Sequence, residues 1–170
     1  MGIEGMAPPI QRHEVEIITV GFQFSGQLEV VGALLNFIND PTRDSLSLYD
    51  ARLTPLTPGS PLKGLFRPHV VVRRPHIVFM YFTSAETRAP LKLLARRELL
   101  VAYTPVAVCR GYFHMSAEAN VRDFLDITQG GLLAVTEARL FPLVEFPAPF
   151  PLEAEQLMIG RAQLQSYHPA

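Results

Sequence analysis

Residues 36–56 read NFINDPTRDSLSLYDARLTPL, and residues 123–143, which lie 87 positions later, read DFLDITQGGLLAVTEARLFPL. The two stretches align without a gap, and they share Phe37/Phe124, Ala51/Ala138, Arg52/Arg139, Leu53/Leu140, Pro55/Pro142 and Leu56/Leu143. The same offset places Arg74 over Arg161. A match of this length at constant spacing indicates an internal duplication. We therefore expect two similar units, with Phe37, Phe124, Arg52 and Arg139 as their structural anchors.

Alternating apolar and polar residues predict strands on both sides of each stretch. In the first half, the predicted strands cover residues 14–24, 27–31, 45–53, 70–73 and 76–82. In the second half, they cover residues 99–110, 112–115 and 132–140 and two strands within 156–167. Gly26 and Gly111 are expected to form bends, and a helical turn is expected before the third strand of each half. The predicted fold is mainly β, with two tandem five-stranded barrel-like units.

The expected domain boundaries follow from this reading. Residues 1–12 are rich in Gly, Pro and Met and predict a flexible N-terminal arm. Residues 13–83 form the first small barrel, and residues 99–170 form the second. Residues 84–98 form a linker, for which a short helix from about Pro90 to Glu98 and an extended segment remain alternatives.

Size and composition favour association. Each predicted unit has roughly 70 to 85 residues, a size at which a single core is only marginally stable. Hydrophobic residues make up 48% of the chain and charged residues only 18%. Such a composition favours buried interfaces over a fully solvated surface. The halves are therefore expected to pack on each other or on other chains.

The compartment is predicted from what the sequence lacks. The N-terminus has no basic start followed by an apolar core, so no secretory signal is predicted. No apolar run approaches the roughly 20 residues of a membrane span. The single cysteine allows no intramolecular disulfide and fits a reducing compartment. A cytoplasmic location is the expectation.

Two resemblances follow from the repeated elements. The order N/D-F-[IL]-[ND] and then [DE]-A-R-L resembles an uncharacterised family of small bacterial β-barrel domains, over residues 14–82 and 99–168. More distantly, the glycine after the first strand and the run VVVRRPHIVFMYF at residues 70–82 are similar to the Sm-like fold. This chain departs from the Sm-like pattern, because Arg74-Pro75 and Arg161-Ala162 stand where Arg-Gly would stand.

The Sm-like resemblance carries two implications. It implies an RNA pocket formed by Asn39 or Asn36 with Arg74, although the second half offers Asp at these places. It also implies edge-to-edge or ring-type assembly of small barrels.

Chemistry-bearing residues do not gather into a recognisable motif. Cys109 has no His or Asp nearby in sequence and is interpreted as a buried structural thiol. The five histidines lack metal-ligand spacing, so neither a metal nor any other cofactor is predicted. The repeated pairs Asp50–Arg52 and Glu137–Arg139 are interpreted as structural ion pairs, because residues two apart share one side of a strand. No catalytic residue is predicted.

Basic residues concentrate in the middle of the chain. Residues 60–97 hold eight Lys or Arg residues and one acid, Glu86. The candidate anion- or partner-binding residues are Arg73, Arg74, Arg88, Lys92, Arg96 and Arg97. If the linker is helical, Arg88, Lys92 and Arg96 share one face. A solvated linker face, or a patch that docks on the acidic second half of a neighbour, is the alternative.

These observations predict a non-enzymatic assembly or accessory subunit of a larger complex that acts through protein–protein contacts. A protein partner or self-assembly is expected. The alternative is a tandem Sm-like RNA-binding protein. An enzyme remains the third class, because the loop at residues 53–68 can hold a site that the sequence does not reveal.

Overall fold

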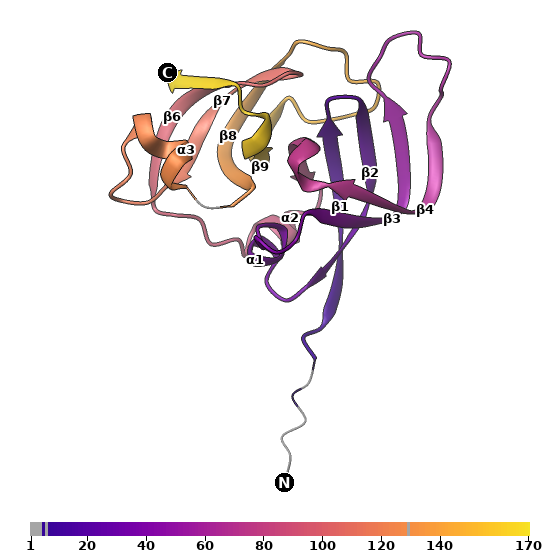
Figure 1. Ribbon diagram of the computed structural model, residues 1–170, viewed down its shortest axis with the longest axis horizontal. Helices are drawn as coiled ribbons and strands as arrows, with labels where there is room; N and C mark the ends of the chain where they lie inside the picture. Colours follow the sequence, from indigo (N-terminus) through magenta and orange to yellow (C-terminus); the bar gives the residue numbers. More distant parts are fainter. Residues whose placement is uncertain (1–4, 6, 129) are drawn as a thin grey trace.

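The structure is a computed structural model that describes residue 5 and residues 7–128 and 130–170. Its ten strands form one antiparallel sheet in the order β10-β6-β7-β8-β9-β5-β1-β2-β3-β4 (Figure 1). The mainly-β prediction is therefore confirmed. No helix in the described part of the chain is long and apolar enough to cross a membrane.

The two halves of the sheet have the same strand order. The first half contains β1 (Ile10–Thr19), β2 (Phe22–Val31), α1 (Leu34–Ile38), β3 (Ser45–Pro55), β4 (Leu65–Arg73), the 3-10 turn η1 (Arg74–His76) and β5 (Ile77–Phe82). After α2 (Ala85–Arg88), the second half contains β6 (Arg96–Tyr103), β7 (Ala107–Met115), η2 (Val121–Asp123), α3 (Phe124–Ile127), β8 (Leu132–Pro142), β9 (Glu153–Gly160), η3 (Arg161–Gln163) and β10 (Ser166–Pro169). The orders are β5-β1-β2-β3-β4 and β10-β6-β7-β8-β9.

The halves share one open sheet, which differs from the expectation of separate barrel-like units. Neither half is closed by pairing of its fourth strand with its fifth in the described part of the chain. Instead, β5 pairs with β1 on one side and with β9 of the other half on its second side. The sheet consequently ends at two free edges, β4 and β10.

Gly26 and Gly111 lie inside long strands, so the expected bends at these glycines are wrong. The chain reverses earlier, between β1 and β2 at Val20–Gly21 and between β6 and β7 at residues 104–106. At both glycines the pairing with the next strand shifts in register. A Cβ on Gly26 would lie 2.9 Å from the Tyr49 carbonyl oxygen, so glycine provides close backbone approach at a β-bulge.

The predicted boundaries need two corrections. β1 already begins at Ile10, so the last residues of the predicted arm are part of the sheet. β6 already begins at Arg96, so the predicted linker ends there and is not helical over residues 90–98. The short helix α2 lies before Pro90, at Ala85–Arg88.

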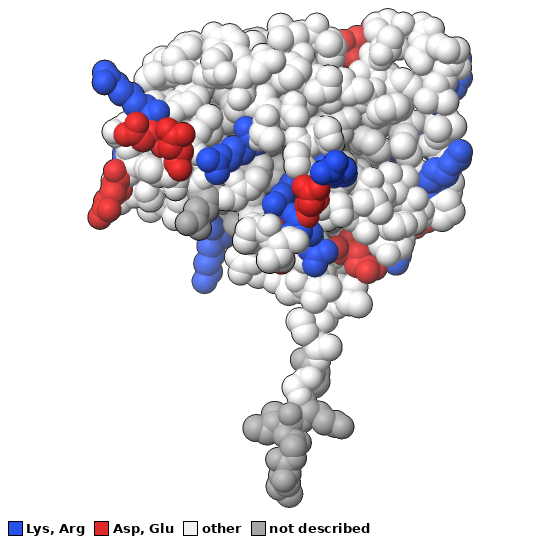
Figure 2. All heavy atoms as spheres, in the orientation of Figure 1, with Lys and Arg blue, Asp and Glu red and all other residues white. Residues whose placement is uncertain are grey.

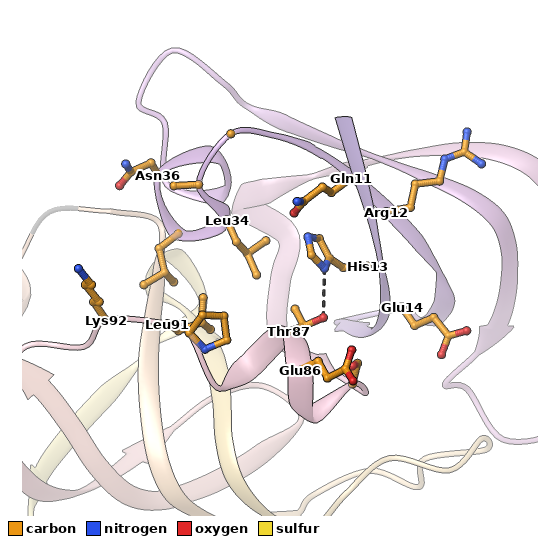
Figure 3. A pocket seen from close by; sticks show the side chains of 15 residues that line it. Gln11, Arg12, His13, Glu14, Leu34, Asn36, Glu86, Thr87, Leu91 and Lys92 are labelled. Carbon is orange, nitrogen blue, oxygen red and sulfur yellow. Dashed lines mark hydrogen bonds between the residues drawn. The ribbon is translucent and has the colours of Figure 1, made fainter. Parts of the chain in front are cut away.

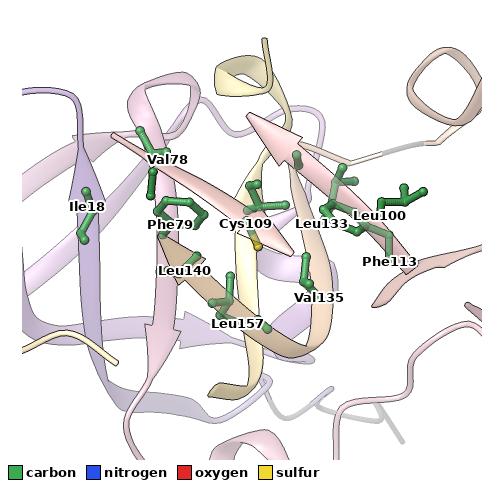
Figure 4. Close-up of a cluster of buried hydrophobic side chains, with 14 of the residues drawn as sticks. Ile18, Val78, Phe79, Leu100, Cys109, Phe113, Leu133, Val135, Leu140 and Leu157 are labelled. Atoms are coloured by element: carbon green, nitrogen blue, oxygen red, sulfur yellow. The ribbon is translucent and has the colours of Figure 1, made fainter. Parts of the chain in front are cut away.

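The core consists of two clusters that meet at β5. One cluster includes Val78 and Phe79 of β5 and lies mainly in the second half (Figure 4). The other includes Ile77 and Met80 and lies mainly in the first half. These four side chains are fully buried. The halves were expected to pack on each other or on other chains, and here β9 of the second half pairs with β5.

The seam between the halves is short and tightly packed. β5 and β9 pair through Phe79 with Ile159 and Met80 with Met158. At the end of β9, a Cβ on Gly160 would lie 1.8 Å from the Ile77 carbonyl oxygen. Only glycine permits this approach.

The two predicted phenylalanine anchors differ in burial. Phe124 is 1% exposed and packs edge-on against Phe113 and Tyr167. Phe37 is only half-buried, and the Arg43 guanidinium lies 4.2 Å from its ring centroid. In α1 the buried positions are Leu34 and Ile38 instead. The helical turns therefore use different residues to reach the core.

Replacement of Gly160 tests the seam. Gly160→Ala is expected to lower the free energy of unfolding by about 1–3 kcal/mol or more, because the added methyl group overlaps the Ile77 carbonyl. Gly21→Ala is the matched control, since nothing lies within 4 Å of its Cβ position, and should change stability by no more than about 0.5 kcal/mol. Urea unfolding measures both. Equal losses in the two variants would contradict this seam.

Truncation of the two phenylalanines tests their unequal burial. Phe124→Ala is expected to cost about 3–5 kcal/mol of stability, because it leaves a cavity in the core. Phe37→Ala is expected to cost less than about 2 kcal/mol, because part of its ring already faces solvent. Denaturant titration provides the comparison, and a larger loss at Phe37 would show that α1 is packed differently.

Candidate functional site: the free edges of the sheet and the arginine residues

The predicted basic residues lie on several different elements of the fold. Arg73 ends β4 and Arg74 begins η1, whereas Arg88 ends α2. Arg96 and Arg97 begin β6, so the proposed helical face shared by Arg88, Lys92 and Arg96 is wrong. In the view of Figure 2, acidic and basic side chains are interspersed, and a broad upper area carries almost no charge.

The arginines near the first half have structural partners. Arg73 forms an ion pair of 2.6 Å with Asp44. Arg74 Nη1 donates to the carbonyl oxygens of Ile38, at 3.2 Å, and Asp40, at 2.7 Å. Arg88 Nη1 donates to the carbonyls of Phe82 and Thr83, next to β5. These contacts hold neighbouring segments of the chain together. Three of the six predicted basic residues therefore have structural partners.

The remaining basic residues are also dispersed. Arg96 donates to the carbonyls of Ala117 and Ala119 and pairs with Glu98. Arg97 pairs with Glu137 at 2.9 Å and lies 4.2 Å from the Tyr112 ring centroid. Lys92 lines a cavity beside α2.

The predicted pairing of residues two apart in β3 and β8 is wrong. Glu137 pairs with Arg97 of β6, and Arg139 pairs with Glu153 of β9 at 3.0 Å. The physical reason is the bulge: Asp50 and Glu137 have φ values of 49° and 50°, which removes the regular alternation of side chains. Arg52 lies opposite Phe66 of β4 on the first half.

The free edges carry short unshielded stretches. On β4, Val70–Val72 lie between the exposed His69 and Arg73, and Val71 is 54% exposed. On β10, Ser166–His168 precede Pro169. With the offset of 87 positions, Val71 and Val72 correspond to Met158 and Ile159 of the seam, and Ser166 and Tyr167 correspond to Phe79 and Met80. The unshielded edge residues are thus the counterparts of the residues that pair at the seam.

A hollow of about 460 Å³ lies on the seam, between the two 3-10 turns. Arg74 and Arg161 line it from either half, together with Asn39, Gly130 and Gly131. Arg161 donates to the carbonyls of Leu125 and Thr128, much as Arg74 does in the first half. Sequence reasoning named Asn39 and Arg74 but not Arg161 as a site residue, although the offset already paired the two arginines.

Asn39 already has partners across the seam. Leu132 N donates to Asn39 Oδ1 at 2.8 Å, and Asn39 Nδ2 donates to Leu132 O at 3.1 Å. The carboxamide therefore pairs with the Leu132 backbone as a neighbouring strand would.

Two titratable groups are strongly affected by burial. The Cys109 thiol is fully buried, and desolvation raises its pKa to about 12, which keeps it protonated and unreactive. Glu16 is half-buried on β1 between Ser25 and Tyr81, and desolvation raises its pKa to about 7. Within the described residues, no three His, Cys, Asp or Glu side chains come together as a metal site.

Comparisons of the chain with models of protein families, with curated proteins and with solved structures gave no match.

The raised pKa of Glu16 predicts a pH-dependent stability. Between its ordinary value of 4.5 and about 7, the folded chain holds this proton and the unfolded chain does not. Stability from Glu16 is therefore greatest at low pH and declines as the pH rises through this window. Glu16→Gln should remove the decline. Urea unfolding of both proteins at several pH values between 4.5 and 8 measures it, as the difference between their unfolding midpoints. Parallel pH profiles would contradict the burial of this carboxyl.

Proposed function

We propose that the protein is a non-enzymatic assembly subunit that binds further copies of itself through the two free edges of its sheet. The proposal rests on one observation: the strands that are free at the edges hold the same positions in their halves as the strands that pair at the seam. The internal seam joins the fourth strand of one half to the fifth strand of the other. A fourth strand, β4, and a fifth strand, β10, are the two that remain free.

Chemistry at both edges supports the proposal. An exposed strand edge offers unpaired backbone groups, and proteins usually shield such an edge with charge, proline or a bulge. β4 carries Arg67, Pro68 and Arg73, and β10 carries Pro169, so the stretches left without charge or proline are Val70–Val72 and Ser166–His168. Pairing of β4 on one copy with β10 on the next is heterologous, so it forms a ring if the rotation closes. The Sm-like resemblance implies this mode of assembly as well.

The junction between copies must differ from the seam at one residue. Gly160 in the seam corresponds to Arg73 at the end of β4. Because no Cβ fits at Gly160, a copy of the seam cannot extend to Arg73. We therefore place the pairing at Val71 and Val72, with Arg73 directed to Asp44.

Tandem Sm-like RNA binding is the second candidate. It is favoured by the seam hollow, where Asn39 lies with Arg74 and Arg161. The carbonyl contacts of both arginines and the pairing of Asn39 with Leu132 weigh against it, because they occupy donors that a nucleotide would need. An RNA component in the native mass spectrum of protein purified from its source would favour this candidate.

Substitution at β4 tests the assembly. Val71→Asp should shift the protein from oligomer to monomer, because a carboxylate at the junction loses its hydration when the edge is covered. Val20→Asp is the matched control: Val20 is 53% exposed, close to the 54% of Val71, but lies in the β1–β2 turn. Native mass spectrometry and light scattering over micromolar concentrations measure the mass. A monomeric wild-type protein, or equal behaviour of the two variants, refutes the proposal.

A further inference from the structure

The seam hollow collects two positive charges from equivalent places in the two halves. Arg74 begins η1 and Arg161 begins η3, and both side chains line this hollow of about 460 Å³. The two turns are joined directly, because Gln163 of η3 donates to the Pro75 carbonyl of η1 at 2.7 Å. The duplicated arginines, 87 positions apart in the sequence, therefore meet at one place on the molecule.

Among the described residues, no acidic side chain balances these charges at the hollow. The remaining lining residues are all uncharged: Asn39, Pro41, Pro75, Gly130, Gly131 and Ala162. The nearby Asp40 binds Arg74 through its carbonyl and uses its carboxylate for Thr42. Neither Arg74 nor Arg161 takes part in any of the ion pairs of the described residues. Because guanidinium groups stay charged at physiological pH, the hollow lacks a counter-charge from the chain.

The cavity beside α2 has a different lining (Figure 3). It has a volume of about 960 Å³ and contains both signs of charge, since Glu14 and Glu86 line it together with Arg12 and Lys92. Arg12 is also paired with Glu29. Mixed charges of this kind give no preference for either sign of ligand, whereas the seam hollow presents positive charge alone.

Part of each guanidinium group remains available to a ligand. Arg74 Nη1 makes both carbonyl bonds of its side chain, which leaves Nε and Nη2 without a partner among the described residues. In Arg161, Nη1 and Nη2 bind carbonyls, and Nε is left. None of these three nitrogens is among the buried side-chain atoms that lack a partner, so solvent reaches all three. Two neighbouring nitrogens of one guanidinium group can bind two oxygens of an anion at once.

Two glycines let the first half reach across the seam at this place. A Cβ on Gly131 would lie 2.9 Å from Arg74 Nε, and a Cβ on Gly130 would lie 2.9 Å from Asn39 Oδ1. Gly130 also has a φ of 100°, which glycine adopts more readily than other residues. Arg74 Nε consequently lies against the backbone of the second half, at the wall of the hollow.

We propose that the seam hollow binds a phosphate group with two negative charges, either as inorganic phosphate or as the end of a phosphate monoester. The charge of this group matches the two arginines, and its oxygens accept from their free nitrogens. The volume of the hollow leaves room for a small organic body beyond the phosphate. A phosphate within an RNA strand carries only one negative charge, so it is a poorer match. Unlike a nucleotide base, a phosphate group needs no donor from Asn39, whose amide already binds Leu132.

Arginine side-chain NMR tests the site on the unaltered chain. Protein labelled with ¹⁵N at arginine is titrated at about pH 8, where a phosphate monoester carries nearly two negative charges. Inorganic phosphate and phenyl phosphate are each expected to shift the Nε–Hε signals of Arg74 and Arg161. Dimethyl phosphate, a diester with one charge, is expected to bind about tenfold more weakly at the same ionic strength. The tighter of the first two probes shows whether free phosphate or a monoester is the ligand.

Ala162→Glu supplies a variant that keeps both arginines and their carbonyl contacts. Ala162 lines the hollow and is exposed, so a longer side chain is expected to be tolerated. The new carboxylate competes for the guanidinium groups and should weaken phenyl phosphate binding by about tenfold or more, as measured by calorimetry. Ala162→Gln adds the same bulk without the charge and should weaken binding by about twofold or less.

Three results would overturn the proposal. One is that phosphate and phenyl phosphate leave both arginine signals of the wild-type protein unmoved. Another is that dimethyl phosphate binds as tightly as phenyl phosphate, which would instead favour a nucleic-acid backbone. The third is equal binding by Ala162→Glu and Ala162→Gln. The hollow lies within one chain, so none of these results depends on the oligomeric state.

Discussion

The contact of β5 with β9 is the constraint on which the rest of the structure depends. β5 is fully buried over Ile77–Met80, which is possible only because a strand of the other half pairs with its second edge. Without β9 it would be an apolar edge strand, which tends to pair with other chains. The cost of the arrangement is a backbone approach so close that residue 160 must be glycine. Each half, too small for a secure core of its own, thereby shares one with its neighbour.

The arginines hold the geometry that this contact requires. Arg74 and Arg161 each bind carbonyls at the helical turn of their own half, and each begins the 3-10 turn that redirects the chain from the fourth strand to the fifth. That redirection sends β5 to β1 and β9 instead of back to β4. A guanidinium group suits the role because its planar array of donors can satisfy several carbonyls at once.

The sequence was informative about strands and less so about their ends. The pattern of apolar and polar residues located most strands, and the run at Ile77–Phe82 was correctly assigned to one of them. Gly26 and Gly111 were misread as bends, because a glycine required by a bulge and one required by a turn are alike in sequence. The arginine contacts could not be predicted, since their partners are backbone carbonyls at distant positions. Gln11 and His13, which line the cavity beside α2, could be placed from the sequence on the same side of the strand as Val15 and Ile17.

The two halves differ at positions where the seam is made once and not twice. Asn39 can donate and accept, and so it pairs with the Leu132 backbone, whereas its counterpart Asp126 would offer only acceptors when ionised. Gly160 admits the seam, whereas Arg73 limits any similar junction at the free edge. His13 is among the residues that line the cavity beside α2, whereas Glu98 is paired with Arg96. In each case one half satisfies its polar groups internally or seals a contact, and the other leaves a group or an edge open. The differences at Asn39 and Gly160 serve the fold, because only one of the two equivalent junctions between a fourth and a fifth strand is made within the chain.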